Sequence, residues 1–161
     1  MSNLQKELYR AAVLTFEELG LFLPSPELDD TQRQAAAEGT VIVPFGGPFS
    51  GHLVVTVCGD VLGGLAANML GEDEVTEPEQ RSDALGEIGN VICGNILPRI
   101  AGTRELFNLR PPRVMLGGTP GTGTDTGHPA VTAQVGLDTG RADLALFLDG
   151  DAAARLEENP R

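Results

Sequence analysis

Apolar residues recur at helical spacing near the start of the chain, at Leu4, Leu8, Ala12, Phe16 and Leu19. This pattern predicts a first helix with Ser2 as its N-cap and Gly20 just past its end. Pro24 and Pro26 follow, and prolines interrupt helices. Residues 21–39 are therefore expected to form a connector, with a short helix around residues 31–37.

Alternating apolar residues then predict two strands joined by a turn. The first strand covers residues 41–43, and the second carries Leu53, Val55 and Val57. The segment between them is rich in glycine and proline, as expected of a turn. Asp60 is expected to cap a helix over residues 61–70 that stops at Gly71. The charged residues 72–80 are expected to link this helix to the next element.

The second part of the chain repeats the order of a helix followed by strands. Residues 81–101 form the longest predicted helix, which ends near Pro98 and Gly102. Strands are expected at 114–116, 131–137 and 144–148, with a bulge at Gly136, and a short helix at 151–158. The order predicts an α+β fold in which long helices cover a mostly antiparallel sheet, built from two related halves. We expect residues 1–161 to form a single domain.

The glycine-rich segment 117–127 resembles a phosphate-binding loop only in its glycines. No Lys-Ser/Thr pair follows it, and no helix is predicted to begin there, so a hairpin loop is the better interpretation. The sequence also lacks a Gly-x-Ser-x-Gly motif and a cysteine–histidine pair suited to nucleophilic catalysis.

Charge and composition narrow the classes of partner. The net charge of −12 disfavours binding to nucleic acid or to anionic membranes. No apolar run is long enough to cross a bilayer, and the N-terminus lacks the layout of a signal peptide, so a cytoplasmic location is expected. Cys58 and Cys93 are expected to be buried thiols. Neither they nor His52 and His128 have ligand-like spacing, so no metal site is predicted.

The helix over residues 81–101 carries the candidate chemistry. On a helical wheel its apolar residues share one face, at Ala84, Leu85, Ile88, Val91, Ile92 and Ile96. Asp83, Glu87, Asn90 and Gly94 share the opposite face, with Gly86 and Gly89 on its flanks. Interior glycines destabilise a helix by about 1 kcal/mol each relative to alanine, so close approach by a sheet or by a partner is expected there.

A polar stripe on a helix can simply be a solvated face, and Glu-x-x-Asn alone is a weak motif. A second copy occurs at Glu105–Asn108, without the preceding aspartate, and leads directly into Pro111. We interpret the second copy as coincidence.

The spacing Asp83-x-x-x-Glu87-x-x-Asn90 on a long amphipathic helix resembles the signature of the CheC/CheX/FliY phosphatase family. The surrounding stretch DALGEIGNVICGNILPRIAG is similar to the CheX form of that helix, and FSGHLVVTVCGDVLGGLAANMLG and LYRAAVLTFEELG also have family character. The resemblance covers the chain apart from the connector and the 117–127 loop. Pro111 and Pro112 come slightly earlier than in the family pattern.

The resemblance implies a chemotaxis phosphatase that acts on the phospho-aspartate of a response-regulator receiver domain. Glu87 and Asn90 are the implied catalytic residues: Asn90 orients the attacking water, and Glu87 contacts a lysine of the receiver. Asp83, Gly86 and Gly94 are implied to face the partner. The phosphatase would need no cofactor of its own, because Mg²⁺ belongs to the receiver.

Two other interpretations remain open at this point. The chain could be a non-catalytic receiver-binding adaptor or a flagellar-switch-related module of the same fold, or a soluble acidic domain with an accidental motif. The resemblance also makes a homodimer through a sheet edge an expectation.

Overall fold

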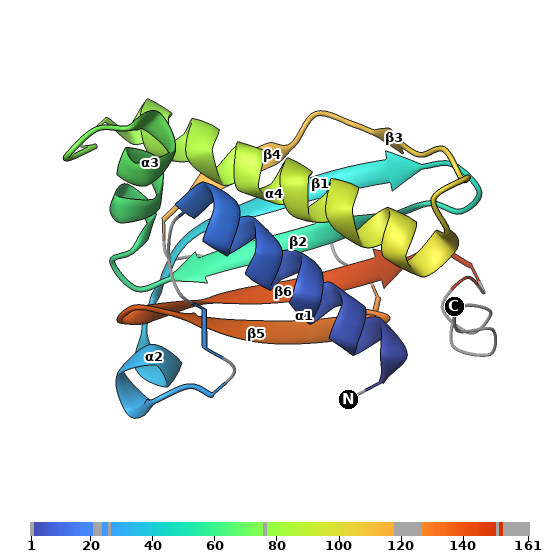
Figure 1. Cartoon of the computed structure of the whole chain (residues 1–161), viewed down its shortest axis with the longest axis horizontal. Coiled ribbons are helices and arrows are strands. Elements are labelled where there is room, and N and C mark those ends of the chain that lie inside the picture. The colour runs from blue at the N-terminus through green and yellow to red at the C-terminus, as the bar shows by residue number, and fades with distance from the viewer. Residues whose placement is uncertain are drawn as a thin grey trace.

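The computed structural model describes residues 2–20, 24–25, 27–75, 77–117, 127–150 and 152. Helices cover one face of a six-stranded antiparallel sheet (Figure 1), in the order β3-β1-β2-β6-β5 with β4 also paired to β1. The helices, with a π-helical turn η1, are α1 Asn3–Thr15, η1 Phe16–Gly20, α2 Asp30–Gln34, α3 Leu62–Leu70 and α4 Pro78–Ala101. The strands are β1 Ala37–Gly46, β2 Gly51–Cys58, β3 Asn108–Leu109, β4 Arg113–Leu116, β5 Val131–Leu137 and β6 Gly140–Leu148.

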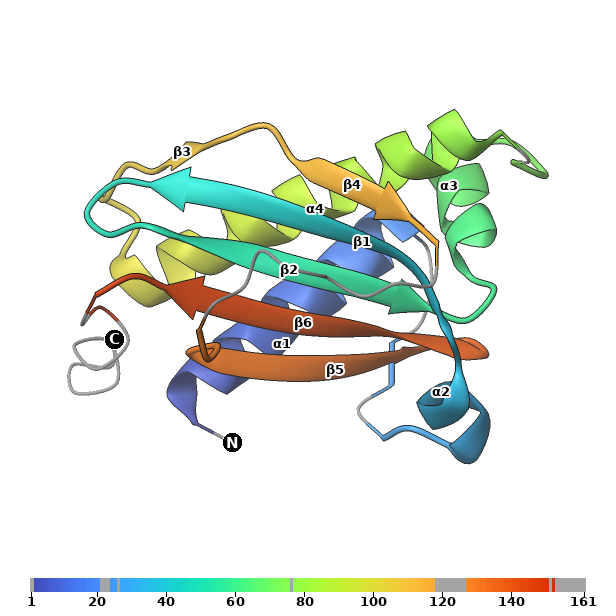
Figure 2. The ribbon, with the colours of Figure 1, turned by 180° about the vertical axis from the view of Figure 1, so that it is seen from behind.

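The sheet is built from two hairpins that meet at its centre. The hairpin β1–β2 belongs to the first half of the chain and β5–β6 to the second, and β2 pairs with β6 between them. Helix α1 packs on β5, whereas α4 packs on β1, so each helix covers the other half's hairpin. From behind, the strands of the central sheet lie in front of both long helices (Figure 2). This arrangement confirms the predicted α+β fold with an antiparallel sheet.

Helix α4 lies where the sequence predicts the long helix, but it begins earlier. Pro78 occupies its first turn, where its missing N–H removes no helical hydrogen bond, so the expected linker is shorter than 72–80. The helix runs through Pro98 and ends at Gly102. Gly89 explains how closely α4 approaches β1, because a Cβ at this position would lie 2.8 Å from a γ-methyl of Val41.

The N-terminus of α3 is held by a residue distant in sequence. A carboxylate oxygen of Glu38, on β1, accepts hydrogen bonds from the backbone N–H groups of Val61 at 3.2 Å and Leu62 at 2.9 Å. The N-cap residue is Val61, so the prediction that Asp60 caps this helix is wrong. The prediction that α3 stops at Gly71 is confirmed, since Gly71 is left-handed with φ 70°.

Several local predictions need correction. The short helix in the connector covers Asp30–Gln34 rather than 31–37, β1 already begins at Ala37, and β3 was not predicted. Gly136 makes no bulge, because β5 pairs with β6 in continuous register. A Cβ at residue 136 would instead meet the hydroxyl of Ser25, which explains the glycine.

The sequence predictions for Ser2 and for the two cysteines agree with the described residues. Ser2 caps α1 by accepting a hydrogen bond from the backbone N–H of Gln5, and Cys58 and Cys93 are buried free thiols. No helix within the described ranges is long and apolar enough to cross a membrane. The loop predicted at 117–127, apart from its two end residues, and the helix predicted at 151–158, apart from Ala152, lie outside the described residues.

Candidate functional site

The outer face of α4 presents the polar stripe that the sequence predicts. We call Asp83, Glu87, Asn90 and Gly94 the α4 stripe. Asn90 is half-buried, and the other three residues are exposed. The opposite face of the helix is anchored in the core, where Leu85, Ile88, Ile92 and Ile96 have no exposed surface. Because the stripe residues lie about one turn apart on an anchored helix, their Cα positions are fixed by the packing beneath them.

The side chains of the stripe are available to a partner. Within the described ranges, no hydrogen bond or ion pair engages the side chains of Asp83, Glu87 or Asn90. The other asparagine of α4 differs, since the amide of Asn95 donates to the hydroxyl of Thr15 at 3.2 Å and so joins α4 to α1. Asn95 therefore has a structural contact, whereas Asn90 keeps both its donor and its acceptor groups for other molecules.

A polar hollow of about 340 Å³ lies along one side of the stripe, between α4 and the segment that enters β4. Its lining comprises Ser82, Asp83, Gly86, Glu87, Asn90, Pro112 and Val114. We call it the α4–β4 hollow. Gly86 is buried at its base, where an added Cβ would be in ordinary contact, 3.5 Å from Pro112 and from Val114. The predicted site residues Asp83, Gly86, Glu87 and Asn90 thus meet in one hollow, whereas Gly94 lies outside its lining.

A second hollow, of about 270 Å³ and mostly apolar, lies on the other side of the stripe. Its lining comprises Met69 and Leu70 of α3 with Gln80, Asp83, Ala84 and Glu87 of α4. We call it the α3–α4 hollow. Asp83 and Glu87 line both hollows and therefore form a carboxylate ridge between them.

Sequence reasoning did not find every residue around the stripe. Pro112 and Val114 lie next to the α4 stripe because β4 pairs with β1. The register of this pairing sets Val114 opposite Val41, on the sheet face that α4 covers. Two adjacent prolines indicate an extended segment, but nothing in the sequence places that segment beside α4. The second Glu-x-x-Asn copy forms no comparable stripe, since Asn108 lies on β3 and Glu105 precedes that strand outside any helix.

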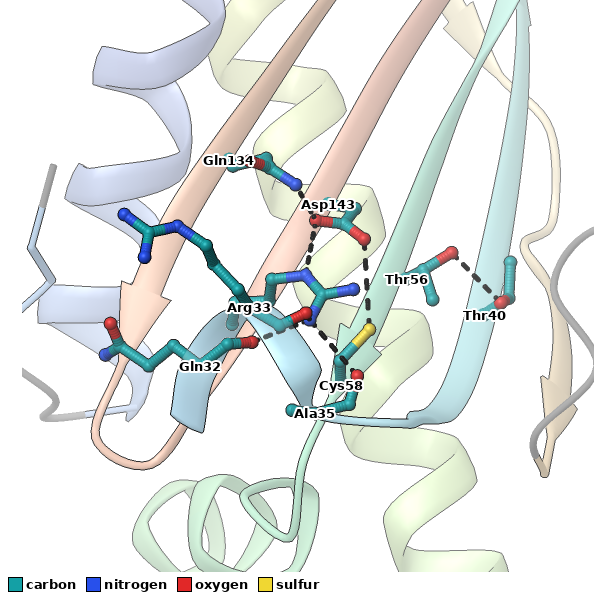
Figure 3. Close-up of polar contacts among 9 residues, drawn as sticks. Gln32, Arg33, Ala35, Thr40, Thr56, Cys58, Gln134 and Asp143 are labelled. Atoms are coloured by element: carbon teal, nitrogen blue, oxygen red, sulfur yellow. Dashed lines mark hydrogen bonds and ion pairs between the residues drawn. The ribbon is translucent and has the colours of Figure 1, made fainter. Parts of the chain in front are cut away.

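A separate polar cluster lies at the end of the sheet near α2 (Figure 3). The guanidinium of Arg141 donates to the backbone carbonyls of Gln32 at 2.6 Å, Arg33 at 2.9 Å and Ala35 at 3.1 Å. Its Nε donates to Asp143 at 3.0 Å, and this hydrogen bond raises the pKa of Arg141. The cluster satisfies the carbonyls at the C-terminus of α2, so we interpret it as structural.

The two cysteines are poor nucleophiles. Burial raises the pKa of the Cys93 thiol to about 12. Burial, with the negative charge of Asp143 adding to it, also raises the pKa of Cys58. Among the described residues, no group of three or more histidine, cysteine, aspartate or glutamate side chains is placed to hold a metal ion.

Comparison with known proteins identifies the family to which the chain belongs. Residues 39–135 match the family described as chemotaxis phosphatase CheX. This match spans more than half of the chain and includes all of α4, so the chain belongs to the CheX family. A search of curated proteins gives no match.

Solved structures share the fold at low sequence identity. CheX from Desulfovibrio desulfuricans superposes with a TM-score of 0.74 at 19% identity, covering 91% of this chain and 99% of that one. CheX from Vibrio vulnificus gives a TM-score of 0.73 at 18% identity, covering 91% and 96%. The CheX–CheY–BeF3–Mg²⁺ complex from Borrelia burgdorferi gives 0.64 at 17% identity, covering 90% and 97%.

Proposed function

We propose that this protein is a phosphatase that hydrolyses the phospho-aspartate of a response-regulator receiver domain. The observation that carries the proposal is the pair Glu87 and Asn90, side by side on one anchored helix, with both side chains unengaged among the described residues. Membership of the CheX family supports the activity. The complex of the Borrelia burgdorferi relative contains CheY, BeF3 and Mg²⁺, which supports a receiver as the partner.

Asn90 is proposed to position the attacking water. Its amide oxygen accepts a hydrogen bond from the water and its N–H donates to neighbouring oxygens, so it adds no negative charge beside the phosphoryl group. The water oxygen attacks phosphorus while the bond from phosphorus to the aspartate oxygen breaks, which releases phosphate and a free carboxylate. Such a reaction depends on positioning and electrostatics rather than on covalent help from the phosphatase.

Glu87 is proposed to dock the helix against a cation of the receiver. Glu87 is exposed and unpaired among the described residues, so no ion pair within them must break before it binds a lysine. Asp83, one turn earlier, adds charge of the same sign to the contact surface, and Gly94 leaves room for the partner because it has no side chain. The Mg²⁺ of the reaction is proposed to be bound by the receiver.

The test is phosphate release from receiver domains charged with acetyl phosphate in the presence of Mg²⁺. Asn90→Ala is expected to lower the catalysed rate by about 100-fold, which is typical for loss of a positioned polar group. Asn108→Ala is the matched control, because Asn108 is exposed and belongs to the second Glu-x-x-Asn copy. Full activity of Asn90→Ala with normal folding would remove the mechanism.

A non-catalytic adaptor of the same fold is the alternative. It predicts binding to a receiver that is independent of hydrolysis, with equal phosphate release in the presence and absence of this protein. Binding to a receiver by calorimetry, without acceleration for any receiver tested, would favour the adaptor.

A further inference from the structure

The α3–α4 hollow has an exposed apolar wall that the chemistry at Asn90 does not use. Leu70, the last residue of α3, is 50% exposed although large apolar side chains are usually buried. Leu70 lines the hollow while half of its surface is exposed, so it stands at the rim, and the left-handed Gly71 ends the helix directly after it. Met69 and Ala84 continue the apolar lining inward.

Negative charge surrounds this apolar wall. Residues 59–98 contain eight carboxylates and a single cation, Arg81. Arg81 lies 3.9 Å from Glu38, so its charge is directed at that carboxylate on β1. The loop that follows Leu70 carries Glu72, Asp73 and Glu74, all exposed, and Asp83 and Glu87 belong to the hollow itself. A complementary surface would present an apolar side chain flanked by lysine or arginine residues.

We propose that the α3–α4 hollow is a second docking site for the receiver, which accepts an apolar side chain of the receiver flanked by basic residues. This inference rests on the proposed function. Its geometric basis is the carboxylate ridge of Asp83 and Glu87, which lines both hollows. A partner that contacts this ridge on its way to Asn90 therefore also reaches the edge of the α3–α4 hollow. The hollow contributes to affinity and to the choice of receiver, and the stripe contributes the chemistry.

Steady-state hydrolysis of the phosphorylated receiver separates these two contributions. Leu70→Ala is expected to raise KM by about tenfold and to leave kcat within about twofold, because it removes binding shared by the ground and transition states. Leu70→Asp is expected to raise KM further, since it adds a charge to an apolar contact. Leu106→Ala is the matched control, because Leu106 is 86% exposed and lies outside the lining of both hollows. The KM of the Leu106→Ala variant should equal that of the unaltered protein.

A charge reversal at Glu72 tests the electrostatic part. Glu72→Lys is expected to lower kcat/KM by about threefold at low salt and much less at 0.5 M salt, where surface charges are screened. Urea unfolding midpoints equal to that of the unaltered protein would show that these surface variants are folded.

The outcomes distinguish this inference from the proposed function. If the unaltered protein accelerates phosphate release in an Asn90-dependent manner but Leu70→Ala and Leu70→Asp keep its KM, the docking site is refuted and the phosphatase stands. A fall in kcat at unchanged KM in the Leu70 variants would also refute it. If no receiver is hydrolysed, the proposed function fails first.

Discussion

Gly89 sets how closely α4 approaches the sheet, so its replacement by alanine tests the packing beneath the candidate site. A Cβ at residue 89 would lie 2.8 and 3.0 Å from the two γ-methyls of Val41 and 3.0 Å from a γ-methyl of Val43. Carbon atoms in contact normally lie about 3.5–4.0 Å apart, so helix or strand must move by about 0.5–1 Å. Valine side chains have few alternative rotamers, so most of this movement falls on the backbone.

Two opposing terms determine the magnitude. Overpacking of this kind costs about 1–3 kcal/mol, whereas alanine stabilises a helix interior by about 1 kcal/mol relative to glycine. Gly94→Ala is the matched control, because nothing lies within 4 Å of a Cβ at residue 94 and only the helix-propensity gain applies. The propensity term cancels between the two variants, so Gly89→Ala should be less stable than Gly94→Ala by about 1–3 kcal/mol.

Urea denaturation followed by circular dichroism measures this difference in the free energy of unfolding. Equal stabilisation by the two substitutions would refute the inference that Gly89 sets the distance between α4 and β1. Under the proposed function, Gly89→Ala should also lower phosphate release by more than about tenfold, because it displaces the adjacent Asn90, and displacements near 1 Å can cost about 100-fold.

Two further predictions concern structural contacts. Glu38→Ala should lower the free energy of unfolding by about 2 kcal/mol, because it removes the acceptor of two N–H groups at the start of α3. Urea denaturation measures this loss, and the control Asp60→Ala is expected to stay within about 0.5 kcal/mol of the unaltered protein. Equal stability of the two variants would contradict the prediction. The thiol of Cys93 keeps its proton in the folded state up to a pKa of about 12, against 9.0 for an ordinary thiol. The folded state therefore binds more protons between these values, and stability should fall as pH rises from about 9 toward 12. Cys93→Ala should show a shallower fall in urea midpoints over this range, and an unchanged slope would count against the burial of the thiol.

Periodicity predicted the parts of the fold that local pattern determines. The apolar face of α4 is continuous enough to place Leu85, Ile88 and Ile92 in the core, and that placement fixes which residues form the stripe. Strict alternation predicted β5 and β6, because one face of each is buried against the helices.

The remainder depends on contacts between distant segments. The cap of α3 comes from Glu38, whereas the local sequence pattern indicates the nearer Asp60, because such patterns consider only caps adjacent in sequence. The glycine at 136 is required by Ser25, which approaches β5 from the connector. The walls of both hollows arise from pairs of segments that the sheet and the helix packing bring together, so only their α4 side was visible in the sequence.

The reciprocal covering of the hairpins links the stability of the site to the far edge of the molecule. Helix α4 rests on β1, while α1, which contacts α4, rests on β5. Separating the halves would expose the apolar faces of both hairpins at once, so neither half has a complete core by itself. The two halves must therefore gain and lose their structure together, and the surface that holds Glu87 and Asn90 persists only while the distant β5–β6 hairpin remains folded.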